Sequence, residues 1–333
     1  MAIKGEGERF RRLDFKQNTP EWVEARRHGV GGSDVAAIMG LSPWKTPAQV
    51  WLEKTGRVEP ADLSDRPYIQ FGHIMEPVIK AWYQERHPAR IVRDVRSMCQ
   101  SIERPWAFVS LDGEVKDGPE WGVLEFKTAR DSRDWADGVP AYYLTQVAHY
   151  LSVTGRRFAD VAVFFRDSCE FAEYRVTTID GPAQYHHERL DADDMRAICD
   201  AVDAFWREFV EADIMPELTG TEGEAQGLAK WHAEAGEGYA EAGGADIAQA
   251  LSDYQQAAAE EKEARARKLA AGNALKAAIG DNKGLITDVC RVTWSRGAST
   301  RLDTKRLKEE RPEVVEAYSV PYVRDGGLRV VDL

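Results

Sequence analysis

The chain has 333 residues, of which 43% are hydrophobic, so it can bury one large core and one smaller core, and we expect one or two domains. Its formal net charge of −12 opposes DNA binding by the surface as a whole, and any contact with DNA therefore requires a local basic groove. No apolar run approaches the ~18 to 20 residues of a membrane span, and MAIKGEGERF at the start has no apolar signal core, which predicts a cytoplasmic protein without membrane contact.

Helical signals come first along the chain. The pairs Thr19–Pro20 and Thr46–Pro47 each predict a helix start, because Thr is a favoured N-cap and Pro a favoured first residue. These two helices are expected to end at His28–Gly29 and at Gly56, and a longer helix is expected over 67–86. Strands are expected around residues 90–97, 106–115 and 121–128.

The next part of the chain alternates helix and strand. A helix is expected from Pro140 to Gly155, followed by strands at 159–166 and 170–179 and a long helix from Gln184 to Ile214. This order predicts an α/β fold in which a mixed sheet is flanked by helices.

The composition changes after residue 215. Residues 216–245 are rich in Glu, Gly, Ala and Thr, which predicts a linker. Residues 246–279 are rich in Ala, Glu, Lys and Arg, which predicts a helical arm. The segment that follows, LITDVCRVTWSRG, predicts strands. We therefore expect a first domain over 1–215, a linker over 216–245 and an accessory unit over 246–333.

A hairpin is expected in SLDGEVKDGPEWGVLEFKTARD, residues 110–131. Its two segments are rich in Val, Leu and Phe, and Asp117–Gly118 between them is a strong turn signal. Pairing the two strands about this turn places Asp112 opposite Glu125 or one residue from it.

The alternation of side chains along a strand separates two faces of this hairpin. Glu125 and Lys127 point to one face, while Leu124 and Phe126 point to the other. Two carboxylates, from Asp112 and Glu125, then crowd one patch, and they do not both stay ionised in a desolvated place unless a cation joins them. The pattern predicts a metal site; the alternative is a surface salt bridge with Lys127, which the flanking apolar strands oppose.

Two other kinds of site are disfavoured by the sequence. The segment GLSPWKT has Trp44 where a phosphate loop requires glycine, so an ATP site is not expected. The cysteines are scattered without a CxxC pair, which argues against a zinc site, an iron–sulfur cluster or a disulfide framework, and all four are expected to be reduced thiols: Cys99, Cys169, Cys199 and Cys290.

Five motifs follow one another between Trp22 and about Phe165: GVGGSDVAAIMGLSPWKTPAQVWLEKTG, FGHIMEP, SLDGEV, LEFKTA and YYLTQVAHYLSVTG. In this order they resemble the motifs of the YqaJ-type viral recombinases. These recombinases are relatives of lambda exonuclease within the PD-(D/E)XK nucleases, so the resemblance implies a restriction-endonuclease-like mixed sheet. The segment LKAAIGDNKGLITDVCRVTW also looks like the tail of several phage members.

The resemblance implies roles for the hairpin residues. Asp112 and Glu125 correspond to the family's magnesium ligands, together with the carbonyl of Phe126, and oxygen ligands are those that Mg²⁺ requires. Lys127 corresponds to the lysine that holds the attacking water and offsets charge on the phosphate. Leu111 stands where the family has a proline, a position that varies among lambda-type enzymes.

Three further residues lie on the expected helices. Glu76 of the GHxxEP motif would be a further metal ligand or would support one, and Gln146 and Tyr150 match the QxxxY motif. The helix that carries the QxxxY motif would turn its polar side to the site. His73 and His149 lie inside matched motifs, and each either touches the site or serves as a structural hydrogen-bonding residue.

The pattern W-x3-R-x2-G-x3-S matches the lambda-exonuclease segment that binds the 5′-phosphate of a DNA end. The resemblance implies that Arg26 and Ser33 bind this phosphate, and a guanidinium suits it because it forms paired hydrogen bonds. The alternative is that Arg26 is a surface residue and Ser33 a helix cap.

The resemblance implies a Mg²⁺-dependent, ATP-independent exonuclease, with Mn²⁺ as the alternative ion. It would resect the ends of linear double-stranded DNA 5′ to 3′, hand the product strand to a single-strand annealing protein, and form a homo-oligomer, a ring-shaped trimer as in family members. The expected location is the host cytoplasm if a phage encodes it. Two alternatives remain: a sequence- or structure-specific endonuclease on the same core, and a non-catalytic DNA-binding relative.

Overall fold

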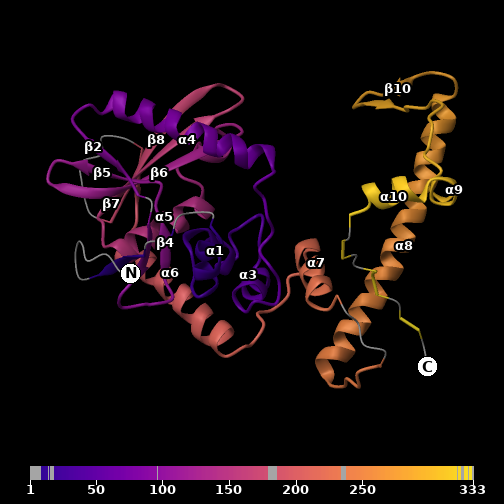
Figure 1. Ribbon diagram of the computed structural model, residues 1–333. Coiled ribbons are helices and arrows are strands. Elements are labelled where there is room, and N and C mark those ends of the chain that lie inside the picture. Colours follow the sequence, from indigo (N-terminus) through magenta and orange to yellow (C-terminus); the bar gives the residue numbers. More distant parts are fainter. Residues whose placement is uncertain are drawn as a thin grey trace. The chain divides into compact units, whose positions relative to one another are not determined.

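A computed structural model describes residues 9–13, 15, 19–95, 97–178, 186–233, 238–320, 322–323, 326–328 and 330–331 (Figure 1). The chain forms two compact units, Met1–Ala233 and Glu234–Leu333. None of the helices in the described part of the chain is long and apolar enough to cross a bilayer.

The first unit combines two sheets with helices around them. Its strands are β1 (Phe10–Leu13), β2 (Ile91–Asp94), β3 (Met98–Ser101), β4 (Phe108–Ser110), β5 (Gly113–Asp117), β6 (Glu120–Ala129), β7 (Phe158–Phe165), β8 (Glu170–Thr177) and β9 (His186–Arg189). Its α-helices are α1 (Pro20–Arg27), α2 (Gly32–Ile38), α3 (Pro47–Lys54), α4 (Pro67–Arg86), α5 (Ala141–Thr154), α6 (Ala192–Ala204) and α7 (Glu222–Trp231).

The larger sheet has six strands in the order β2-β5-β6-β7-β8-β9. Strand β6 pairs in parallel with β7, and β8 with β9, while the other neighbours are antiparallel. The sheet is therefore mixed, and the predicted α/β fold class is confirmed.

Helices cover both faces of this sheet, with α4 on one side and α5 on the other (Figure 1). Leu124 and Phe126 of β6 lie in the hydrophobic cluster that includes Ile79 and Tyr83 of α4. The neighbouring residue Val123 lies in the larger cluster with the apolar side chains of α5. Alternate residues of β6 thus belong to different cores, as the period of a strand requires.

The predicted hairpin is present, but the predicted strand 106–115 is divided. Its first part, β4, pairs with β3 in a smaller sheet of order β1-β3-β4, and its second part, β5, pairs with β2 and β6 in the larger sheet. Asp112 lies at the point where the chain passes from one sheet to the other. Gly118 takes a φ of +58° in the turn between β5 and β6, which favours glycine there.

The long helix predicted over 184–214 is wrong in its first part. Residues 184 and 185 lie outside the described residues, and β9 follows at His186–Arg189, parallel to β8. The helix α6 begins only after Asp191, whose side chain caps it, and it continues as a π-helical turn over Phe205–Glu211. Pairing with β8, a contact between distant segments, has overridden the local helical signal.

The predicted linker 216–245 contains α7. The ring of Trp231 in α7 lies 5.7 Å from that of Trp51 in α3, and Gly227 lies so close to Leu52 that a Cβ there would come within 2.8 Å of its side chain. The compact first unit consequently ends at Ala233, later than the predicted residue 215.

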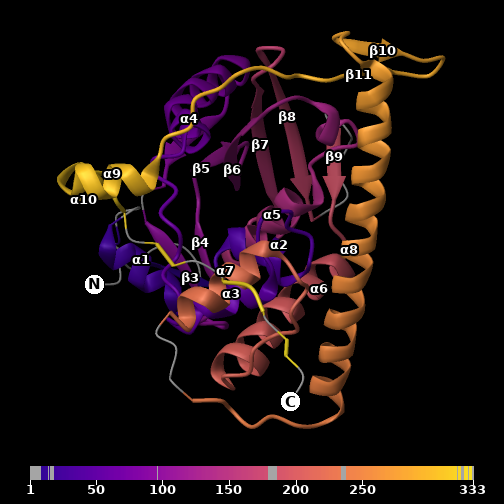
Figure 2. The same ribbon diagram turned by 90° about the vertical axis from the view of Figure 1, so that its right-hand side faces the viewer.

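The second unit has a long helix with a small two-stranded sheet at one end of it (Figure 2). Helix α8 (Ala245–Ile279) is followed by the antiparallel pair β10 (Gly284–Ile286) and β11 (Arg291–Thr293), and then by α9 (Thr304–Glu310) and α10 (Pro312–Tyr318). The predicted helical arm and strand-containing unit are confirmed.

Candidate active site

The turn between β5 and β6 brings Asp112 and Glu125 together. Gly113 is paired with Leu124, so Asp112, one residue before Gly113, faces Glu125, one residue after Leu124. The carboxylate of Asp112 accepts a hydrogen bond of 2.9 Å from the backbone N–H of Phe126. The predicted convergence of the two carboxyl groups is present in the structure.

Both carboxyl groups carry raised pKa values. Glu125 is 2% exposed, and burial together with the neighbouring carboxylate of Asp112 raises its pKa to about 8. Burial also raises the pKa of Asp112, although the ammonium of Lys127 and the N–H of Phe126 act against it. At neutral pH, Glu125 therefore holds a proton unless a further cation stabilises its charge.

Lys127 contacts the same group of side chains. Its Nζ donates to Glu125 Oε1 at 2.7 Å and to Gln146 Oε1 at 3.2 Å. Burial lowers the pKa of Lys127, but the carboxylates of Glu125 and Asp112 outweigh burial, and the net direction is upward. Lys127 is thus a fixed ammonium at this centre.

Helix α5 closes the centre from one side. Gln146 donates through Nε2 to Glu125 Oε1 at 2.9 Å and to Tyr150 Oη at 2.5 Å. Burial and the nearby carboxylates raise the pKa of Tyr150 well above its usual value, so its hydroxyl stays protonated. The two residues of the QxxxY motif lie one turn apart and therefore face the same site.

Glu76 of α4 lies at the edge of the centre. Its Oε1 is 3.0 Å from Nδ1 of His73, and burial and the charge of Asp112 raise its pKa. Among the described residues, no three His, Cys, Asp or Glu side chains are grouped so that they could hold a metal ion. The structure thus places Glu76 within electrostatic reach of Asp112, paired with His73.

The donor set fits a divalent cation in charge and chemistry. Within the described part of the chain, Glu125 Oε2 is a buried oxygen without a hydrogen-bond partner. Such an atom costs free energy unless a ligand satisfies it, and carboxylate oxygens are ligands that Mg²⁺ prefers. Asp112 and Glu125 would hold the ion.

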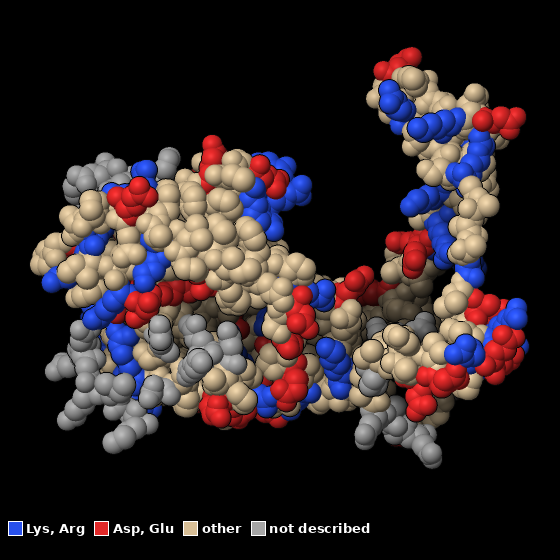
Figure 3. Space-filling model, turned by 45° about the horizontal axis from the view of Figure 1, so that its top comes forward, with Lys and Arg blue, Asp and Glu red and all other residues tan. Residues whose placement is uncertain are grey.

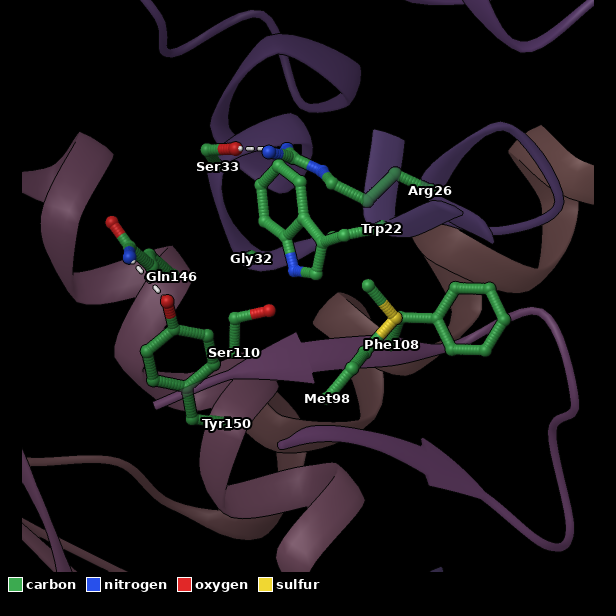
Figure 4. Close-up of a pocket in the computed structure, with 10 residues that line it drawn as sticks. Trp22, Arg26, Gly32, Ser33, Met98, Phe108, Ser110, Gln146 and Tyr150 are labelled. Atoms are coloured by element: carbon green, nitrogen blue, oxygen red, sulfur yellow. Dashed lines mark hydrogen bonds between the residues drawn. The ribbon is translucent and has the colours of Figure 1, made fainter. Parts of the chain in front are cut away.

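A pocket of about 100 Å³ adjoins this centre (Figure 4). Arg26 Nη2 donates to Ser33 Oγ at 3.0 Å on one side of it, and Gln146 and Tyr150 line another side. Its volume is smaller than the ~300 Å³ of sites for drug-sized ligands, and it has room for a phosphate group.

The pocket residues are held in place by their neighbours. The guanidinium of Arg26 lies 4.7 Å from the ring centre of Trp22, so the arginine is not an isolated surface residue. Ser33 lies inside α2, and Gly31 occupies the N-cap position, so Ser33 is not the helix cap. The structure brings the two predicted phosphate ligands together.

Asp34 and Lys54 form a buried ion pair next to the pocket residues, and the sequence patterns did not predict it. Asp34 and Lys54 are 2.7 Å apart, and Lys54 also donates to the backbone carbonyl of Arg26 at 2.9 Å. Burial raises the pKa of Asp34, but the charges of Lys54 and Arg26 outweigh it, and the pKa falls well below its usual value. Asp34 also accepts from the N–H of Gly31, a capping pattern readable in GGSD.

The two histidines have different surroundings. His149 is fully buried, and its Nε2 donates to the carbonyl of Phe108 at 3.2 Å. Burial and the charge of Arg104 lower the pKa of His149 to about 4, so it is neutral at physiological pH. His149 therefore has the structural role, whereas His73 reaches the edge of the centre through Glu76.

Comparisons with known proteins return the family that the sequence motifs resemble. Residues 21–157 match the family model described as the YqaJ-like viral recombinase domain, which confirms the resemblance over that part of the chain. The uncharacterized protein YqaJ of Bacillus subtilis (strain 168) is 28% identical over 301 residues, which is 89% of each chain.

Among solved structures, the chain is similar to an alkaline exonuclease, LHK-Exo, from Laribacter hongkongensis. The identity is 22% and the TM-score 0.44, over 59% of this chain and 94% of that chain, and the structure of LHK-Exo in complex with dAMP gives the same values.

Proposed function

We propose that this chain, whose residues 21–157 match the YqaJ-like viral recombinase domain, is a metal-dependent exonuclease acting on the ends of linear double-stranded DNA. The observation that carries the proposal is a group of four side chains, of which Glu125 and Gln146 are buried and Asp112 and Lys127 half-buried. In this group Glu125 Oε2 has no hydrogen-bond partner among the described residues. A carboxyl group whose pKa is raised as far as that of Glu125 is typical of active sites.

Asp112 and Glu125, with the carbonyl of Phe126 and with Glu76, would hold Mg²⁺, or Mn²⁺ in its place. Bound there, the ion would lower the pKa of a water molecule and offset negative charge on the phosphate. Lys127 would orient the attacking water and stabilise the charge that develops during hydrolysis. Gln146 and Tyr150 would fix the position of Glu125.

Arg26 and Ser33 would bind the 5′-phosphate of a DNA end. This assignment supports 5′ to 3′ resection, because the pocket shares Gln146 and Tyr150 with the carboxylate centre. Acidic and basic side chains are interspersed on the face of the first unit drawn in Figure 3, so DNA would be contacted through this local site. A single-strand annealing protein would receive the product strand, and the assembly would be a homo-oligomer, in the ring form a trimer.

A time course on linear duplex DNA labelled at its ends tests the proposal. With Mg²⁺ and no ATP, mononucleotides should be released from linear duplex, and a closed circular plasmid should remain intact. Ca²⁺ should allow binding without hydrolysis, because its geometry is less demanding. Cleavage of the circle would favour an endonuclease, and no hydrolysis of either DNA with Mg²⁺ or Mn²⁺ would favour a non-catalytic relative.

A further inference from the structure

Trp44 is an exposed aromatic side chain close to the carboxylate centre. It lies in the loop between α2 and α3 and is 67% exposed, although tryptophan is on average a highly buried residue. Its ring centre is 5.0 Å from that of Tyr142 in a T-shaped arrangement and 6.5 Å from that of Tyr143. A large aromatic surface therefore faces solvent at this point.

A continuous series of rings connects Trp44 to the catalytic lysine. The ring of Tyr143 lies 4.6 Å from Nζ of Lys127 and 5.6 Å from the ring of the buried Trp135. Trp44 thus extends an aromatic cluster that begins in the core and passes directly beside Lys127.

The loop that carries Trp44 is fixed at both ends. The N–H of Ser42 donates to the carbonyl of Ala36 at 3.0 Å, and Ser42 Oγ accepts from the N–H groups of Trp44 and Lys45, each at 3.2 Å. Thr46 then caps α3 with a reciprocal pair of hydrogen bonds. The backbone that carries Trp44 is therefore held by the protein's own hydrogen bonds, and its ring lies against that of Tyr142.

We propose that Trp44 stacks against a base of the cleaved strand, next to the phosphodiester held at Lys127. The inference rests on the proposed function and adds a positioning residue to it. A nucleotide offers both a flat ring for Trp44 and a phosphate for the ammonium beside it. Stacking on a protein ring does not depend on which base is present, as an exonuclease that removes every nucleotide requires.

The first test measures stacking without hydrolysis. The fluorescent base 2-aminopurine is placed in turn at the first and second nucleotide of the 5′-phosphorylated strand, and fluorescence is followed on binding in EDTA. The unchanged protein and Trp44→Phe should alter the fluorescence at one position. Trp44→Leu, which keeps an apolar side chain without a ring, and Trp44→Ala should lose most of this change, while Tyr239→Ala, at a fully exposed aromatic residue of the second unit, should keep it.

The second test uses initial rates with Mg²⁺ on intact duplex and on duplex that lacks the base at the position found above. Stacking on one ring changes affinity by about tenfold, so removing the base should slow the unchanged protein by about that factor. Trp44→Ala should be slower by about tenfold on intact duplex and no slower when the base is missing.

The two tests separate this inference from the proposed function. If no protein hydrolyses DNA, the proposed function fails, and the fluorescence in EDTA still decides the role of Trp44. Trp44 does not stack on a base if Trp44→Ala keeps the fluorescence change. The same holds if Trp44→Ala slows hydrolysis of the duplex without the base as much as it slows hydrolysis of intact duplex. A variant that changes only the oligomeric state would assign Trp44 to a contact between proteins and would overturn the inference.

Discussion

At the scale of single residues, the carboxyl groups of Asp112 and Glu125 lie where burial disfavours their ionised forms. Burial raises the pKa of both groups, and the charge of Asp112 raises that of Glu125 further, whereas the ammonium of Lys127 lowers both. In the proposed function, a bound cation would offset the free-energy cost of ionising these groups.

Replacing Glu125 with Gln tests its role most directly. The amide keeps an acceptor oxygen for Lys127 and Gln146 but removes the negative charge, so hydrolysis should fall by at least about a thousandfold, consistent with the loss of a charged catalytic group. Circular dichroism should show an unchanged fold. Near-normal turnover by folded Glu125→Gln protein would remove Glu125 from the catalytic centre.

His149 predicts a pH dependence of stability. Because its pKa is lowered to about 4 in the folded protein, the folded state resists protonation, and stability should fall as the pH drops from 6.5 towards 4. Between pH 7 and pH 5, His149 should lower the free energy of unfolding by an amount on the order of 2 kcal/mol.

Urea unfolding of the unchanged protein and of His149→Gln, at pH 7 and at pH 5, measures the stability that is lost because of His149. Gln can still donate to the carbonyl of Phe108, and it does not titrate. The stability of the variant should therefore change less between pH 7 and pH 5. Parallel curves for the two proteins would show that His149 is not buried in its neutral form.

Arg26 predicts a preference for one kind of DNA end. A charge-assisted contact is worth ~1.5 to 3 kcal/mol, so 5′-phosphorylated duplex should be degraded roughly tenfold to a hundredfold faster than 5′-hydroxyl duplex. Arg26→Ala should lose this preference, and Arg26→Lys should recover part of it because an ammonium lacks the planar fork. Initial rates at fixed ionic strength give the ratio, and equal rates on both ends for the unchanged protein would contradict the assignment.

At the scale of elements, the site depends on how closely α2 approaches α5. A Cβ on Gly32 would lie 2.4 Å from Tyr150 and 3.0 Å from Gln146, which is closer than side chains pack. At Gly31, by contrast, a Cβ would meet no atom nearer than 3.5 Å. The close approach of Tyr150 and Gln146 therefore requires glycine at position 32, whereas position 31 has room for a Cβ.

These two glycines form a matched pair of variants. Gly32→Ala should displace the side chains of Gln146 and Tyr150, lower stability by about 1 to 3 kcal/mol and reduce activity. Gly31→Ala should lose less, up to about 1 kcal/mol, because alanine is a poorer N-cap. Thermal unfolding and initial rates of both proteins check the difference, and equal effects would mean that α2 and α5 are not in tight contact.

At the scale of the whole molecule, the first unit is expected to fold without the second. Truncation after Gly244 keeps α7 and should leave a folded protein with residual nuclease activity. Truncation after Met215 removes α7 and with it the contact between Trp231 and Trp51, which should lower stability by about 1.5 to 3 kcal/mol.

Calorimetry of the two truncated proteins measures this difference. A higher melting temperature for the longer protein is the expected result. Equal melting temperatures would place the end of the first domain near 215, and loss of structure in both would mean that the second unit is required for folding.

The sequence by itself determined the features that depend on neighbouring residues. The start of α4 at Pro67, the end of α5 before Gly155 and the turn at Asp117–Gly118 follow from local backbone preferences, and the structure confirms them. The meeting of Asp112 with Glu125 was also predictable, because a short turn sets the register of a hairpin.

Only the tertiary structure decided the features that join distant segments. The division of 106–115 between two sheets, the strand β9 and the helix α7 depend on partners far away in the chain. The same is true of the pocket, in which Arg26 meets Gln146, and of the contact between Trp44 and Tyr142. Packing between distant segments outweighs the ~1 kcal/mol differences of local propensity, so these features cannot be read from short stretches of sequence.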